Sequence, residues 1–189
     1  MTRSFVRVFT VGVILLAAVA SAKAADFLRN EIFGAAGIGK TYDDEGSLGS
    51  GLNGGCGYGY RFSRWLGVQA EVNAFRTKRE FSPQFIPFQA SGGHLMGSAL
   101  LYLTRGSAQV YLIGGAGVLH TSVSSDFAGA TSNPSANGFA INFGGGVKAF
   151  VTPRVSIRPE VRVFAGNSHG AIEPPFSDIR LSVGAGYHW

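Results

Sequence analysis

The clearest hydrophobic pattern in the chain lies in residues 178–189. Every odd position from Ile179 to Trp189 is apolar or aromatic, whereas the even positions are charged, polar or glycine. Because side chains alternate between the two faces of a β-strand, this pattern predicts a strand with one apolar face. An apolar edge strand is an aggregation template in a soluble protein. The segment therefore favours a membrane barrel, which pairs its last strand with its first and places aromatic rings at the bilayer interface.

The rest of the chain predicts further strands, separated alternately by short and long connections. The short connections are tight turns at 63–65, 104–108 and 152–154, and the longer, polar or Gly/Pro-rich ones are at 41–49, 78–91, 122–137 and 166–177. This alternation is typical of an outer-membrane barrel with periplasmic turns and extracellular loops. We therefore predict an all-β fold, an eight-stranded antiparallel transmembrane up-and-down β-barrel. Its strands are expected at 29–40, 50–62, 66–77, 92–103, 109–121, 138–151, 155–165 and 178–189.

Charged residues recur on one face of several predicted strands. In the strand at 66–77, for example, Val68 and Val72 share one face, while Gln69 and Glu71 share the other. An Arg or Lys at the bilayer midplane costs about 2–4 kcal/mol, so such faces are expected to line the lumen. An eight-stranded barrel is just wide enough inside for its own side chains. We therefore expect a packed ion-pair plug, in which the carboxylates pair with the bases; its members would be Glu71, Glu160, Arg158, Arg162, Lys148 and Arg180.

In some predicted strands the lumen-facing and outward-facing residues cannot be distinguished. The segments 31–40, 54–60 and 114–118 are so rich in Gly and Ala that neither face can be assigned. Glycine in a strand allows the close approach and bending that barrel closure requires. Pro159 lies inside a predicted strand and cannot donate a ladder hydrogen bond, so we expect a β-bulge there.

The first residues have the three parts of a secretory signal peptide. Arg3 and Arg7 precede an apolar run at 8–20, and Ser21-Ala22-Lys23-Ala24 follows it. This arrangement predicts cleavage between Ala24 and Ala25. A membrane-spanning anchor is the alternative, but the run is shorter than the roughly 20 apolar residues that a spanning helix needs. We therefore expect a signal peptide at 1–24 and one barrel domain at 25–189.

Charge and cysteine content argue against nucleic-acid binding, disulfide bonding and a cysteine metal site. The formal net charge is +5, but loss of the predicted signal peptide leaves 13 basic and 11 acidic residues, a net charge of +2. No basic run with interleaved aromatic residues occurs, so no nucleic-acid partner is expected. Cys56 is the one cysteine, which excludes an intramolecular disulfide and gives no sign of a metal cluster. As a small hydrophobe within a strand, Cys56 needs no function.

Several runs resemble a known family. They are Asn142-Phe143-Gly144-Gly145-Gly146-Val147-Lys148, Val151-Thr152-Pro153-Arg154, Ile157-Arg158-Pro159-Glu160-Val161-Arg162 and Gly114-Gly115-Ala116-Gly117-Val118. The first three resemble the final hairpin, and the last the central strand, of small outer-membrane β-barrels. These form the OmpA/OmpX-like outer membrane protein β-barrel domain group of diderm bacteria. The resemblance covers essentially all of 25–189; it implies the fold and says little about activity.

Two groups of loop residues contain candidate chemistry. Asp43-Asp44-Glu45 could hold a divalent cation, but its spacing is not that of a calcium loop and a solvated acidic loop tip is the simpler interpretation. His120-Thr121-Ser122 with Asp126, and Ser168-His169 with Glu173, contain the residue types of an acyl-hydrolase triad. Lipid A deacylases, which are small barrels, use such a set. These residues lack that family's full motif and an oxyanion feature, so we predict no catalytic, cofactor-binding or metal-binding residue.

Three functional hypotheses follow. The first is a non-enzymatic outer-membrane protein with four exposed loops, serving envelope structure or surface interaction. The second is a lipid-acting acyl hydrolase of the same fold. The third, a soluble lipocalin-like barrel, would place the apolar faces inside a ligand cup. For the first we expect outer-membrane lipid and lipopolysaccharide as partners, the barrel-assembly machinery engaged through the strand ending at Trp189, and a monomer without cofactors.

Overall fold

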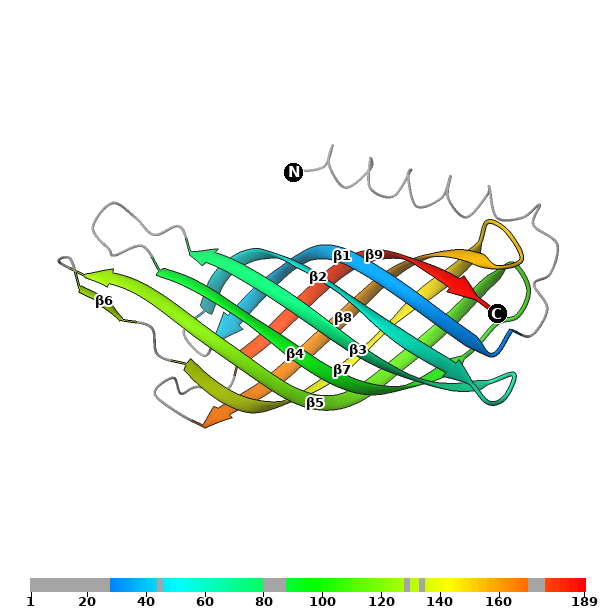
Figure 1. Ribbon diagram of the computed structural model, residues 1–189, viewed down its shortest axis with the longest axis horizontal. Coiled ribbons are helices and arrows are strands. Elements are labelled where there is room, and N and C mark those ends of the chain that lie inside the picture. Colours follow the sequence, from blue (N-terminus) through cyan, green and yellow to red (C-terminus); the bar gives the residue numbers. More distant parts are fainter. Residues whose placement is uncertain (1–27, 44–45, 80–87, 128–129, 133–134, 170–175) are drawn as a thin grey trace.

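The computed structural model describes residues 28–43, 46–79, 88–127, 130–132, 135–169 and 176–189. Eight long antiparallel strands form a closed barrel, and a short further strand lies at one end (Figure 1). No helix among the described residues is long and apolar enough to cross a membrane. The strands are β1 (Asn30–Asp43), β2 (Gly46–Arg61), β3 (Leu66–Arg79), β4 (Phe88–Tyr102), β5 (Ala108–Phe127), β6 (Ala130–Ser132), β7 (Ser135–Phe150), β8 (Val155–His169) and β9 (Phe176–His188).

The barrel closes between its first and last strands. Each long strand pairs with its neighbour in sequence, β4 pairs with β5, and β9 pairs with β1. The β1–β9 ladder runs from Glu31↔His188 to Tyr42↔Ser177. Beyond it, Asn30 and Trp189 exchange two backbone hydrogen bonds of 3.1 Å. The predicted pairing of the last strand with the first is therefore confirmed, and the closed ladder leaves no sheet edge along the barrel wall.

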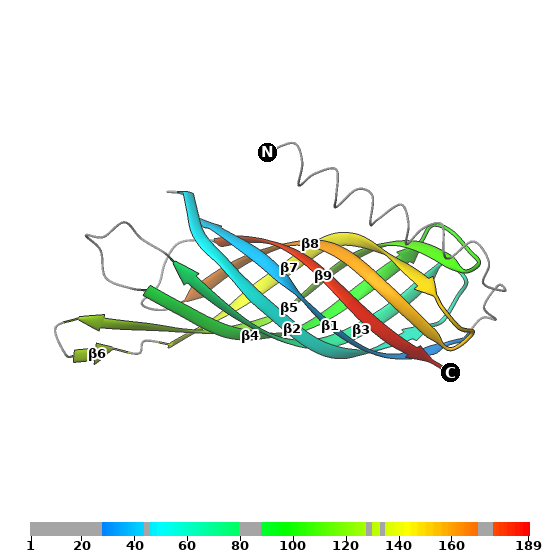
Figure 2. The ribbon, with the colours of Figure 1, turned by 90° about the horizontal axis from the view of Figure 1, so that it is seen from above.

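The two ends of the barrel differ. Three tight turns, at 62–65, 103–107 and 151–154, lie at the end that also holds the C-terminus, here called the short-turn end (Figure 1). These turns agree with the predicted ones to within about one residue. At the opposite, extended end the strands run further than predicted, and β5 projects beyond the barrel to pair with β6 (Figure 2).

The prediction of a loop at 41–49 is wrong, because most of this segment belongs to two paired strands at the extended end. β1 continues to Asp43 and β2 begins at Gly46, with a register shift between Thr41 and Tyr42. The alternation of apolar and polar residues ends before the strands do. The backbone ladder between β1 and β2 continues beyond it. A pattern of side chains therefore marks where the apolar band ends, not where the strand ends.

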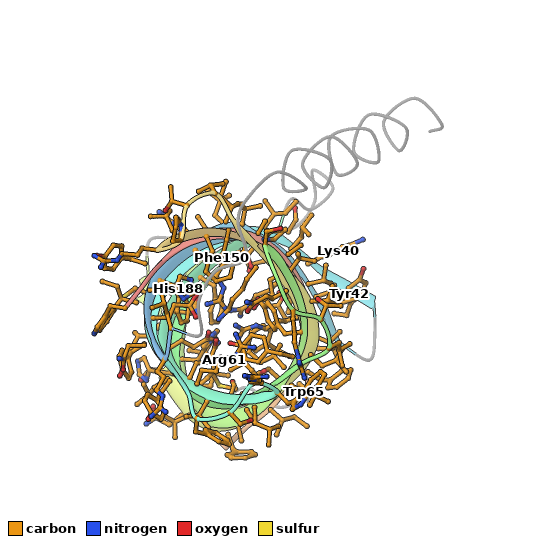
Figure 3. The ribbon with its side chains drawn as sticks, turned by 90° about the vertical axis from the view of Figure 1, so that its right-hand side faces the viewer. Lys40, Tyr42, Arg61, Trp65, Phe150 and His188 are labelled. Carbon is orange, nitrogen blue, oxygen red and sulfur yellow. The ribbon has the colours of Figure 1, made fainter. Side chains whose placement is uncertain are left out.

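Side chains along most of each strand alternate between the two faces of the barrel wall. Val68 and Val72 are exposed on the outer surface, whereas Gln69 and Glu71 are buried in the lumen. Figure 3, which looks along the barrel from the short-turn end, shows the same contrast for other strands, with Arg61, Phe150 and His188 inside and Lys40 and Tyr42 outside. The apolar faces point outward, so a lipocalin-like cup lined by them is ruled out.

Two apolar clusters occupy the parts of the lumen that the charged residues leave. One contains Leu100, Tyr102, Tyr111 and Ile113, and the other contains Met96, Leu119, Ala140 and Phe164. All are buried. The lumen is therefore the core of this protein, with apolar residues packed around a polar centre.

One inward-facing glycine shows why these strands need small residues. A Cβ atom on Gly144 of β7 would lie 2.2 Å from the carbonyl oxygen of Val161 and 2.8 Å from Cα of Arg162 in β8. Both distances are too short for a real contact, so only glycine lets β7 and β8 approach this closely.

The expected bulge at Pro159 is absent. The β7–β8 pairs on either side of it, Gly146↔Glu160 and Ala149↔Ile157, keep the same register. On the β9 side, Pro159 pairs with Val183 without a shift. The ladder therefore tolerates a missing donor at this position without inserting a residue, and the prediction of a bulge is wrong.

Candidate functional site

Among the described residues, eight charged side chains are buried in the lumen. Four are acidic and four are basic, and none is more than 6% exposed. Charges buried away from water are costly unless they are paired, and equal numbers allow every one to be paired. The eight are Glu31, Glu71, Glu160, Asp178, Lys148, Arg158, Arg162 and Arg180.

Glu31 of β1 is the carboxylate nearest the short-turn end. It forms an ion pair with Lys148 of β7 and accepts a hydrogen bond of 3.3 Å from Nη1 of Arg158 in β8. Nε2 of His188 in β9 lies 3.7 Å from Oε1 of Glu31. Lys148 donates a further hydrogen bond of 2.9 Å to the hydroxyl of Tyr102. Glu31 therefore joins the first strand to the last three.

Arg158 lies at the centre of the network. Its Nη2 lies within hydrogen-bonding distance of side-chain oxygens of Gln69, Tyr111 and Glu160, at 3.1, 3.3 and 3.2 Å. The Tyr111 hydroxyl donates a hydrogen bond of 2.5 Å to Glu160. The guanidinium also lies over the ring of Phe33, 4.0 Å from its centroid. These contacts replace the hydration that burial removes from the arginine.

Arg162 binds two carboxylates. Its Nη1 and Nη2 donate to Oε1 and Oε2 of Glu71 at 2.5 and 2.9 Å, which is the two-pronged geometry that suits a guanidinium and a carboxylate. Its Nε lies 2.5 Å from Oε1 of Glu160. Gln69 donates to Glu71 at 2.9 Å. The network is thus continuous from Glu31 to Glu71.

Arg180 forms a separate pair nearer the extended end. Its Nε donates to Asp178 at 2.5 Å, and its guanidinium lies 4.2 Å from the centroid of the Phe164 ring. Its Nη1 is 3.4 Å from a ring nitrogen of His94. These contacts extend the buried polar side chains of the lumen beyond Glu71.

Little space remains between these side chains. One cavity of about 20 Å³ is lined by residues that include Glu31, Lys148 and His188. A second, also of about 20 Å³, is lined by residues that include Arg162 and Arg180. Each has room for about one water molecule. Within the described part of the barrel, the charged residues therefore form a plug rather than a solute path.

The sequence prediction of this plug was correct for part of the network. Glu71 pairs with Arg162, and Glu160 pairs with both Arg158 and Arg162, as expected. The remaining two bases have other partners.

Lys148 pairs with Glu31 and Arg180 pairs with Asp178, so their predicted pairing with the carboxylates at 71 and 160 is wrong. Glu31 was missed because it lies at the start of a Gly/Ala-rich segment whose faces could not be assigned. Asp178 could have been found, since it precedes Arg180 by two residues and therefore shares its face.

Only the first residue of the acidic run at 43–45 belongs to the described part of the chain. Asp43 is the last residue of β1, and Asp44 and Glu45 lie outside the described residues. Among the residues described, no group of three or more His, Cys, Asp or Glu side chains could hold a metal ion.

The candidate triad residues lie near the extended end. His120, Thr121, Ser122 and Asp126 belong to β5, Ser168 and His169 end β8, and Glu173 lies outside the described residues. Nδ1 of His120 lies 2.7 Å from Oδ1 of Asn137, which is its register partner in β7. The structure therefore places an amide, rather than a serine hydroxyl, against this imidazole.

Cys56 lies on the outer face of β2. Its side chain is exposed there, on the same face as Tyr58 and Tyr60.

Comparison with known proteins identifies similar barrels. Residues 9–188 match the family model described as "Outer membrane protein beta-barrel domain". A search of curated proteins finds no match. Among solved structures, Neisserial surface protein A superposes with a TM-score of 0.60 at 22% identity, over 85% of this chain and 97% of that one.

Two further solved structures are also similar. The attachment invasion locus protein Ail of Yersinia pestis, solved with the heparin analogue sucrose octasulfate, gives a TM-score of 0.59 at 17% identity, over 86% of this chain and all of that one. A major outer membrane protein of Thermus thermophilus gives 0.56 at 11% identity, over 85% and 99% of the two chains. At these identities the likeness concerns the fold.

Proposed function

Because the chain belongs to the outer membrane protein β-barrel domain family, we propose that it is a non-enzymatic outer-membrane protein whose filled lumen supports four extracellular loops. The observation that carries this proposal is the balanced set of eight buried charges in the lumen. A barrel filled in this way serves as a rigid support instead of a channel. The loops would serve envelope structure or surface interaction.

The proposal includes export and orientation. Residues 1–24 would direct export and be removed, leaving the domain at 25–189. The short-turn end would face the periplasm and the extended end the exterior, as is usual for outer-membrane barrels. N-terminal sequencing of protein purified from outer membranes should start at Ala25. A start at Met1, or recovery in the soluble periplasm, would contradict it.

The proposed partners are lipids and the assembly machinery. Lys40 and Arg76 are exposed on the outer face at the extracellular end, where lipopolysaccharide phosphates would lie. The strand ending at Trp189 would be engaged by the barrel-assembly machinery. A filled, closed barrel needs no second copy, so we propose a monomer.

Conductance tests the filled lumen. Protein purified from outer membranes and inserted into planar bilayers should give no steady, porin-like current steps, because side chains occupy the interior. A general porin inserted in the same way provides the positive control. Large, stable single-channel steps from this protein would refute the proposal.

A lipid-acting hydrolase remains the second candidate. The observation in its favour is that His120 and Ser122 share one face of β5 near the extracellular rim. Purified protein and a His120→Ala variant should be incubated with lipopolysaccharide and phospholipid, and the released fatty acids measured by mass spectrometry. We expect no release from either protein. Release that depends on His120 would replace the first proposal with this one.

A further inference from the structure

The short-turn end carries one exposed arginine at each of four positions around the barrel. Arg29 precedes β1, next to the end of β9. Arg64 lies in the β2–β3 turn, Arg105 in the β4–β5 turn and Arg154 in the β7–β8 turn. The strand order spaces these positions around the whole circumference. We call the four together the arginine ring.

Aromatic side chains accompany this ring. The guanidinium of Arg105 lies over the ring of Trp65, 4.2 Å from its centroid. Nη1 of Arg154 lies 3.5 Å from the hydroxyl of Tyr187, whose ring stacks on Trp189 at 6.2 Å. Trp and Tyr concentrate at the level of lipid headgroups in membrane proteins. The aromatic partners therefore place these guanidinium groups at headgroup depth.

No exposed side-chain carboxylate offsets the ring. Among the described residues of the short-turn end, the acidic side chain is Glu31, which points into the lumen, is 4% exposed and is already paired with Lys148. The exposed charged side chains described at this rim are therefore basic. A guanidinium presents a fork of donors that matches the oxygens of a phosphate.

We propose that the arginine ring binds the phosphodiester headgroups of anionic phospholipids, such as phosphatidylglycerol, in the periplasmic leaflet. This rests on the membrane orientation given under the proposed function. Four separated arginines, of which Arg105 and Arg154 lie beside interfacial aromatic rings, suit several small anionic headgroups better than one large ligand. The bound lipids would surround the barrel as an annulus at this end.

The protein carries its own reporters for a test. Its two tryptophans, Trp65 and Trp189, both lie at the short-turn end and are 46% and 45% exposed. Protein purified from outer membranes would be reconstituted in phosphatidylcholine vesicles with 20 mol% phosphatidylglycerol, an amount chosen at roughly the level where surface charge matters. In one preparation the phosphatidylglycerol would carry brominated acyl chains, which quench tryptophan fluorescence. In the other, an equal amount of the phosphatidylcholine would carry them.

Brominated phosphatidylglycerol should quench more strongly than brominated phosphatidylcholine. We expect phosphatidylglycerol to be enriched roughly two- to fivefold around the tryptophans. The upper value corresponds to the full electrostatic attraction between one arginine and an anionic lipid. The preference should fall as salt rises. It should disappear when the four arginines are replaced together by glutamine, and persist when they are replaced by lysine, which keeps the charge. Heat-modifiability gels would establish that both variants fold.

Other outcomes would overturn the inference. Equal quenching by the two lipids in the wild-type protein would do so, as would an unchanged preference in the glutamine variant. Sedimentation with purified peptidoglycan that needs the ring, without any lipid preference, would assign the ring to the cell wall instead. Failure to insert into vesicles at all would count against the proposed function, and is distinguished by the gels.

Discussion

Neighbouring residues of β8 face different surroundings. Val161 is 50% exposed on the outer face, whereas Arg162 is 5% exposed in the lumen. Replacing Val161 with Arg places a charge against lipid and should destabilise the barrel by about 2–4 kcal/mol near the bilayer midplane. Reversible folding into lipid vesicles, followed by denaturant titration, measures this change. A change within about 0.5 kcal/mol, typical of an ordinary surface site, would contradict the outward placement.

Replacing Arg162 with Leu tests the lumen. This change leaves Glu71 without its two-pronged partner and removes one of the bases around Glu160. Breaking a buried pair by removing one partner costs about 3–5 kcal/mol, and less if water enters the lumen. The same vesicle titration gives the value. If Arg162→Leu is neutral while Val161→Arg is severe, the ion-pair plug is wrong.

At this scale the sequence predicts a lumen residue wherever polar and apolar positions alternate cleanly. Glu71 and Arg162 were assigned in this way. Glu31 was not, because its neighbours along β1 are mainly glycine and alanine, which carry too little apolar surface to mark a face. Partner choice was harder still, since Lys148 and Glu31 are brought together only by closure of the barrel.

The spacing between elements depends on glycine. Gly144→Ala should push β7 and β8 apart, because its Cβ atom would overlap the backbone of Val161. Overpacking of this kind costs roughly 1–3 kcal/mol. Gly97→Ala is the matched control, since its Cβ atom would have 3.9 Å to the nearest atom, the carbonyl oxygen of Ala116. Equal stability of both variants in vesicle titrations would show that the strand spacing adapts freely.

Strand existence and pairing could be predicted, but strand length could not. The tight turns were located because short polar segments interrupt apolar alternation on both sides. At the extended end, β5 continues to Phe127 through Ser122, Ser124 and Ser125, which give no apolar pattern. These residues pair through the backbone ladder with β4 and β6, and a pattern of apolar side chains does not record backbone pairing.

For the whole molecule, Cys56 offers a test of what surrounds the barrel. As the one cysteine, it is exposed on the outer face, beside Val72 of β3 in the ladder. A water-soluble maleimide should leave it unmodified when the protein is folded in lipid nanodiscs, because lipid covers this face. It should react fully in urea.

The control is a Cys56→Ser protein carrying Pro153→Cys, which places the thiol in the exposed β7–β8 turn. This variant should react in nanodiscs. Rapid labelling of Cys56 in folded, nanodisc-embedded protein, measured by mass spectrometry, would mean that water rather than lipid covers the outer face.

The ion pairs of Glu31 join the first strand to strands that come last in the chain. Its partners Lys148 and Arg158 lie 117 and 127 positions later in the chain, and His188 follows in the last strand. Until β7, β8 and β9 are in place, this carboxylate lacks its ion-pair partners Lys148 and Arg158. Contacts of such long range form slowly, since the chain entropy must be lost before they stabilise anything. The ion pairs of Glu31 with Lys148 and Arg158 are therefore complete only when the barrel closes.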